Sequence, residues 1–128
     1  MITGRAQTSP RAWDPRLRGL TCAIPFEDVW QAALSLAGGG IRGWTLEESD
    51  DENGVIAAKA RRIGGALYDI FIFVRLDENA QTRVDAQATA QRASTDFGSA
   101  RRLLRRFFRA LDKVLARPVR RRRSARLP

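Results

Sequence analysis

The side chains that could do chemistry in this sequence are arginines and carboxylates, because its 128 residues include no histidine. Without histidine the chain has no Ser-His or Cys-His pair, and it lacks the usual ligand sets of zinc. Cys22, the only cysteine, can form no disulfide within the chain and would lack its usual base as a nucleophile. We interpret it as a small apolar residue on a strand. We therefore expect a protein that is not an enzyme and that uses no metal or other cofactor.

Two local patterns could be mistaken for ligand sites. The acidic run Asp50-Asp51-Glu52 leads into Asn53-Gly54, and its spacing does not match a calcium-binding loop. We interpret it as a solvated turn, because Asn-Gly strongly favours a hairpin. The run of three glycines at 38–40 lacks the Lys-Ser or Lys-Thr that completes a phosphate-binding loop. This run is interpreted as the end of a helix.

Another group of polar residues surrounds the start of the last predicted helix. Asp96 or Ser99 can cap this helix, and Arg83 or Arg102 can pair with Asp85 or Asp96. The interpretation we favour is a structural cap and an ion pair that fix the corner between strand and helix. The alternative is an anion site where free N–H groups and an arginine converge, although an acid at the cap opposes it. The candidate polar corner consists of Arg83, Asp85, Asp96, Gly98 and Arg102.

The positive charge is concentrated at the C-terminal end. Residues 101–128 contain 12 lysines and arginines and one acid, whereas residues 1–100 contain 11 basic and 13 acidic residues. If 103–115 is helical, its apolar residues share one face and its basic residues share the other. The candidate anion-binding residues are the arginines of this helix and of the tail, namely Arg101, Arg105, Arg106, Arg109, Arg120, Arg121, Arg122 and Arg123.

Two kinds of partner fit these arginines. In the first interpretation, the chain is a binding module that docks on an anionic membrane surface, where each basic residue contributes about 1 kcal/mol. Its folded body would then engage a protein or a small apolar ligand. In the alternative, the same arginines bind nucleic acid without sequence preference. We favour this less, because no aromatic residue lies among the tail arginines to stack on bases.

No stretch of the sequence has the length and apolar character of a membrane span. The N-terminal residues also lack the apolar segment of a secretory signal. We therefore expect a cytoplasmic protein that can be peripheral to a membrane.

The spacing of apolar residues predicts a strand, a helix, four meandering strands and a long helix. The first helix should run from Pro25 to the three glycines, and the second should end before Pro118. Antiparallel hairpins covered by helices form an α+β two-layer sandwich, here a sheet of about five strands crossed by a long amphipathic C-terminal helix. The most apolar strand should lie in the centre. We expect the strands at 19–24, 43–47, 55–62, 66–76 and 82–91.

Three segments are expected along the chain. Residues 1–18 lack periodicity and are interpreted as a flexible arm, 19–116 as the folded domain, and 117–128 as an arginine-rich tail that cannot bury a core. On the last strand, small inward residues such as Ala86 and Ala88 could line a cavity or could let the long helix pack closely.

The segment TRVDAQATAQRASTDFG, followed by ARRLLRRFFRALD, resembles the C-terminal signature of the domain-of-unknown-function 1499 family. Upstream, Val29-Trp30, Gly43-Trp44 and Tyr68-Asp69-Ile70 also fit, so the resemblance covers about residues 20–115. The family pattern carries over at all five residues of the candidate polar corner. Other polar positions of the pattern are replaced here, by Gln87, Ala88, Ala90, Ala93 and Ala100. The resemblance implies no settled activity, and it favours a membrane-associated role because many members of the family look membrane-associated.

Overall fold

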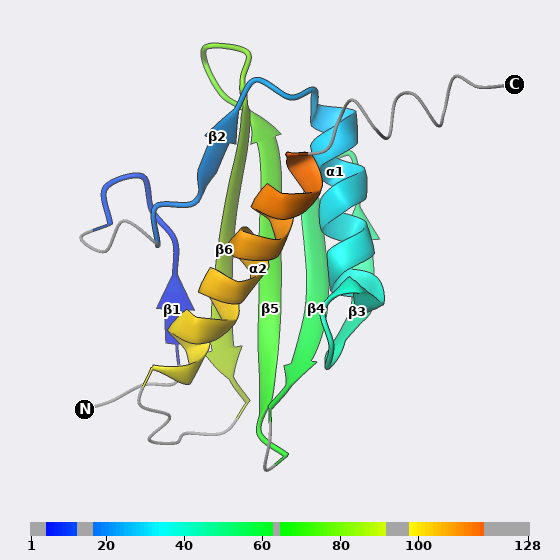
Figure 1. Cartoon of the computed structure of the whole chain (residues 1–128), viewed down its shortest axis with the longest axis vertical. Helices are drawn as coiled ribbons and strands as arrows, with labels where there is room; N and C mark the ends of the chain where they lie inside the picture. Colours follow the sequence, from blue (N-terminus) through cyan, green and yellow to red (C-terminus); the bar gives the residue numbers. More distant parts are fainter. Residues whose placement is uncertain (1–4, 13–16, 63–64, 92–97, 117–128) are drawn as a thin grey trace, which may run out of the picture.

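Six strands form one antiparallel sheet in the computed structural model, which describes residues 5–12, 17–62, 65–91 and 98–116 (Figure 1). Two helices, α1 (Phe26–Ser35) and α2 (Ser99–Leu115), lie side by side on one face of this sheet. The predicted α+β two-layer arrangement is therefore confirmed. The strands are β1 (Arg5–Gln7), β2 (Leu20–Cys22), β3 (Trp44–Asp50), β4 (Val55–Arg61), β5 (Leu67–Leu76) and β6 (Thr82–Ala90).

The strand order is β1-β6-β5-β4-β3, and β2 also pairs with β6. The three hairpins from β3 to β6 follow the chain order, as the turn residues predicted. Strand β5 lies in the centre, between β4 and β6, in agreement with its apolar composition. The short strands β1 and β2 follow one another along the outer edge of β6.

The expectation of a flexible arm over residues 1–18 is wrong for its described part. Arg5–Gln7 pairs with Gln87–Thr89 of β6, and Ala6 and Leu17 belong to the core. A three-residue strand carries too little periodicity to be recognised locally. Its pairing is fixed by β6, which lies far along the chain.

Helix α1 begins after Pro25 and places Glu27 and Asp28 in its first turn, where their charges complement the helix dipole. A π-helical turn over Leu36–Gly40 follows it, and the chain leaves the helix at Gly39, whose φ is 129°. The predicted helix end at the glycines is confirmed. The apolar side of α1, including Val29 and Ala33, is fully buried.

The core lies between the sheet and the two helices. Alternate residues of β5, including Ile70 and Ile72, point into it. On β6 the inward residues Ala86 and Ala88 are fully buried. Helix α2 contacts β6, so the burial of these small side chains favours close packing of the helix on this strand. Phe107 of α2 reaches across to Trp44 of β3, and their stacked rings are 5.8 Å apart.

Candidate functional site

The outer surface of α2 carries the arginines predicted to bind anions. The apolar stripe on its other side is buried at Leu103, Leu104, Phe107, Leu111 and Leu115 and half-buried at Phe108 and Val114. Arg101, Arg106 and Arg109 are exposed and Arg105 is half-buried, so all four lie on the side of the helix that faces away from the sheet. The predicted separation of an apolar from a basic face is confirmed. The four tail residues Arg120, Arg121, Arg122 and Arg123 lie outside the described residues.

These four arginines have no carboxylate partner in the part of the chain that the structure describes. Arg101, Arg105 and Arg109 follow each other at intervals of four residues. Like charges at this spacing repel each other by roughly 0.2–0.5 kcal/mol per pair. An anionic surface would relieve this repulsion when it binds. We call this surface, formed by Arg101, Arg105, Arg106 and Arg109, the α2 arginine surface.

The candidate polar corner does not form one cluster. Arg83 and Asp85 lie on the sheet face that points away from α2, whereas Gly98 and Arg102 belong to the start of α2 in the helix layer. Asp96 lies outside the described residues. Gly98, with a φ of 92°, occupies the N-cap position, and Ser99 is the first residue of the helix rather than its cap. Arg102 contacts the Ser99 hydroxyl at 3.2 Å.

The predicted ion pair between Arg83 and Asp85 does form. The Arg83 Nη2 and Asp85 Oδ1 atoms are 2.6 Å apart, and a second hydrogen bond from Nε to Oδ2 spans 3.0 Å. The guanidinium also donates to the Thr21 hydroxyl and to the backbone carbonyl of Arg18. Four of its five N–H donors are therefore used within the protein, which leaves the guanidinium little capacity to bind an external anion.

Thr8 completes this network from the other side. Its hydroxyl donates to Asp85 at 2.8 Å and accepts a hydrogen bond from the backbone N–H of Ala86 at 2.9 Å. The network thus joins the chain next to β1 and β2 to the edge of β6, rather than fixing the corner between strand and helix. Thr8 and Thr21 were not predicted, because nothing in the local sequence relates them to β6.

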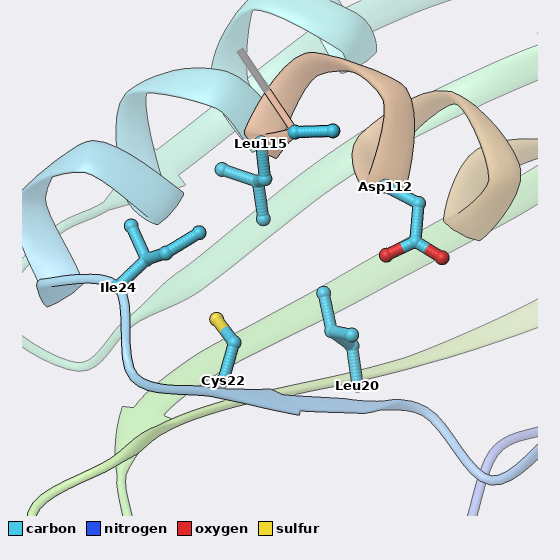
Figure 2. A pocket seen from close by; sticks show the side chains of 6 residues that line it. Leu20, Cys22, Ile24, Asp112 and Leu115 are labelled. Atoms are coloured by element: carbon cyan, nitrogen blue, oxygen red, sulfur yellow. The ribbon is translucent and has the colours of Figure 1, made fainter. Parts of the chain in front are cut away.

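A shallow groove lies between β2 and the C-terminal end of α2 (Figure 2). The side chains of Cys22 and Asp112 point into it from opposite walls, and Leu20, Ile24, Leu115 and Ala116 complete the lining. Its volume of about 200 Å³ is below the roughly 300–1,000 Å³ typical of small-molecule sites. Cys22 lies on a strand, as predicted.

The acidic run forms the predicted turn between β3 and β4. Asp50 accepts hydrogen bonds from the side-chain amide of Asn53 and from the backbone N–H groups of Glu52 and Asn53. The Asn53 amide is the main reason why the pKa of Asp50 lies below its ordinary value of 3.8. Across the described residues, no group of three or more Cys, Asp or Glu side chains is arranged to hold a metal ion.

None of the helices in the described part of the chain is long and apolar enough to cross a membrane. In comparisons with known proteins, the sequence matches no family and no curated protein.

Proposed function

We propose that this chain is a non-catalytic binding domain, similar to the domain-of-unknown-function 1499 family, that docks on anionic membrane surfaces through the α2 arginine surface and the arginine-rich tail. The observation that carries the proposal is the absence of carboxylate partners around these four arginines within the described chain. Guanidinium groups in this state are available to lipid phosphates, with which they form bidentate hydrogen bonds.

The burial of the apolar stripe of α2 supports a surface contact rather than insertion. Leu104, Phe107 and Leu111 are fully buried against the sheet, so the helix can touch headgroups without leaving the core. From Arg101 to Arg109 the surface extends over about 12 Å of helix, because each residue advances the helix axis by about 1.5 Å. Several headgroups can contact a surface of that length at once.

The same packing makes nucleic acid the less favoured partner. Phe107 is fully buried and stacked on Trp44, so it is not available to stack on bases. Helix α2 also lies beside α1 on the same face of the sheet (Figure 1). Such a helix presents one side to a partner, so its contacts with nucleic acid would be limited to phosphates.

Co-sedimentation with vesicles tests this proposal. The full chain should bind vesicles that contain phosphatidylserine, and the binding should weaken as salt rises because exposed charges are screened. The triple variant R101Q/R105Q/R109Q should lose about 100-fold in affinity, given about 1 kcal/mol per basic residue at such a surface. The matched control is R11Q/R42Q/R61Q, which removes the same charge from exposed arginines elsewhere.

A tail variant with glutamine at Arg120, Arg121, Arg122 and Arg123 measures the contribution of the tail. Duplex DNA, added as a competitor, separates the two partner classes. Poor displacement from vesicles by DNA supports membrane docking, and efficient displacement favours the nucleic-acid alternative. Equal losses in the helix variant and in its control would contradict the proposal, because net charge alone would then explain the binding.

A further inference from the structure

The face of the sheet that points away from α1 and α2 carries two exposed phenylalanines. Phe71 and Phe73 lie on the central strand β5, and each is 37% exposed. Their neighbours on the adjacent strand β4 are Ala57 and Val55, which are half-buried and continue the apolar surface. A sheet face in contact with water normally carries polar residues at these positions. An exposed apolar patch in the middle of a sheet marks an interaction surface.

Charged residues flank the two phenylalanines along the same strand and on the same face. Asp69 precedes Phe71 by two residues, and Arg75 follows Phe73 by two residues. Arg75 has no ion pair within the described part of the chain. Asp69 lies 3.7 Å from Lys59, and this contact is partly exposed. The row is therefore acid, phenylalanine, phenylalanine, base.

This row is complementary to itself when it is reversed. A second β5 placed antiparallel over the first sets Phe71 against Phe73, and it sets Asp69 against Arg75. A twofold axis that lies between the two sheets, perpendicular to the strands and level with the midpoint between Phe71 and Phe73, produces both contacts twice. A partner of a different sequence would need to reproduce this pattern by chance, whereas another copy of the chain carries it already.

We propose that two copies of this chain associate through these sheet faces, with Phe71 and Phe73 at the centre and two Asp69–Arg75 ion pairs beside them. Two sheets packed face to face lie about 10 Å apart with their strands within about 30°. Side chains as long as arginine span this separation. The helices remain on the outside of the pair, because they cover the opposite face of each sheet.

The size of the face sets the expected strength. Strands β4, β5 and β6, about 4.8 Å apart and up to about 30 Å long, offer roughly 400 Å² per copy. Strand β3 is left out of this area because its Glu48 and Asp50 lie level with the phenylalanines and would face like charges in the second copy. A stable complex buries about 800 Å² per partner. We therefore expect a reversible dimer whose population rises with concentration.

The free edge of the sheet is a poorer route to self-association. Strand β3 forms this edge, and it carries Glu47, Glu48 and Asp50. Two such strands paired edge to edge would bring like charges together, which is destabilising. Charged edge strands of this kind prevent sheets from joining through their edges.

Analytical ultracentrifugation of the full chain, over a wide concentration range, tests the proposal with a charge exchange. D69R and R75D should each weaken the dimer by about tenfold, because each puts like charges at two contacts worth up to about 1 kcal/mol apiece. The double variant D69R/R75D should return close to the wild-type dissociation constant. Within one copy these residues are about 20 Å apart along the strand, so such a rescue reports contact between copies.

F71E provides a second test, because it places a charge at the centre of the proposed contact. A chain that keeps its far-UV circular dichroism and becomes monomeric supports the proposal. A wild-type chain that stays monomeric at every concentration overturns it. A dimer that is unaffected by both the charge exchange and F71E also overturns it.

Discussion

Arg83 and Asp85, two residues apart on β6, form a 2.6 Å ion pair on the sheet face opposite the helices. The pair is mostly buried, with 8% of the Arg83 side chain and 22% of the Asp85 side chain exposed. It lies beside the junction of β1 and β2, and its hydrogen bonds reach Thr8 and Thr21. The pair thus connects the N-terminal residues to β6, the strand with which β1 and β2 pair.

We expect R83A to destabilise the protein by about 3 kcal/mol, because it leaves a mostly buried carboxylate without its cation. Guanidinium denaturation followed by tryptophan fluorescence measures this loss. The control is K59A, whose pairs with Glu47 and Asp69 span 3.8 and 3.7 Å and are more exposed. That variant should lose less than about 1 kcal/mol. Similar losses in both variants would show that the Arg83 network has no special role.

Gly19 should tolerate no side chain, because the Arg83 network occupies the space beside it. Its φ is 76°, and a Cβ atom there would lie 2.6 Å from both Arg83 Nη2 and the Val84 carbonyl. G19A should therefore cost more than about 2 kcal/mol, through backbone strain and steric overlap. G65A is the matched control, since Gly65 also has a positive φ of 89° but has no atom within 4 Å of that position. Equal melting temperatures for the two variants would count against this account.

The turn between β3 and β4 should respond to acid through Asp50. Hydrogen bonds from Asn53, with a smaller one from Glu52, lower the pKa of Asp50 from its ordinary 3.8. A carboxyl whose pKa is lower in the folded state adds stability above its unfolded pKa and loses it as the pH falls through the folded value. NMR titration should give a pKa below 3.8 for Asp50 in the wild type. N53A should move it back toward that value, and an unchanged pKa in N53A would contradict the assignment.

The like charges of the α2 arginine surface, which favour binding to an anionic partner, should lower the stability of the folded protein. R101Q/R105Q/R109Q removes three like-charge contacts at four-residue spacing, the third between Arg109 and Lys113. Thermal unfolding should therefore show a gain of about 1 kcal/mol. The same variant should lose vesicle binding. A loss of stability would mean that these arginines support the fold, and the proposed function would then lose its main support.

If both proposals hold, vesicles should cluster. A dimer formed through the open sheet faces carries its two α2 arginine surfaces on opposite outer sides, so it can touch two membranes. Light scattering should show clustering that rises with protein concentration. D69R should still bind vesicles but should cluster them weakly, and D69R/R75D should restore clustering. If D69R clusters vesicles as strongly as the wild type, the clustering does not depend on this dimer.

The parts of the fold that the sequence predicted are those governed by neighbouring residues. Asn53-Gly54 marked the hairpin, the three glycines marked the end of α1, and the spacing from Leu103 to Leu115 marked the buried stripe of α2. The network around Arg83 was only half predicted. Its ion pair joins residues two apart, whereas Thr8 reaches Asp85 across 77 positions of sequence. No local pattern encodes a contact of that kind.

The exposure of the open sheet face was also not predictable from local sequence. The composition of β5 predicted a central strand, and an apolar strand in that position is normally buried on both faces. Only the placement of both helices on one side revealed that Phe71 and Phe73 are exposed.

The pairing of β1 and β2 with β6 also determines when the fold can close during synthesis. Ala6 pairs with Ala88, so β1 leaves the ribosome before its partner and stays unpaired until β6 has been made. At about 5–20 residues per second, that delay is roughly 4–16 s. Strands β3 to β5 can form their hairpins during this interval, whereas the N-terminal residues must wait. A nascent chain that stops before β6 therefore cannot complete the sheet, however much of it has been translated.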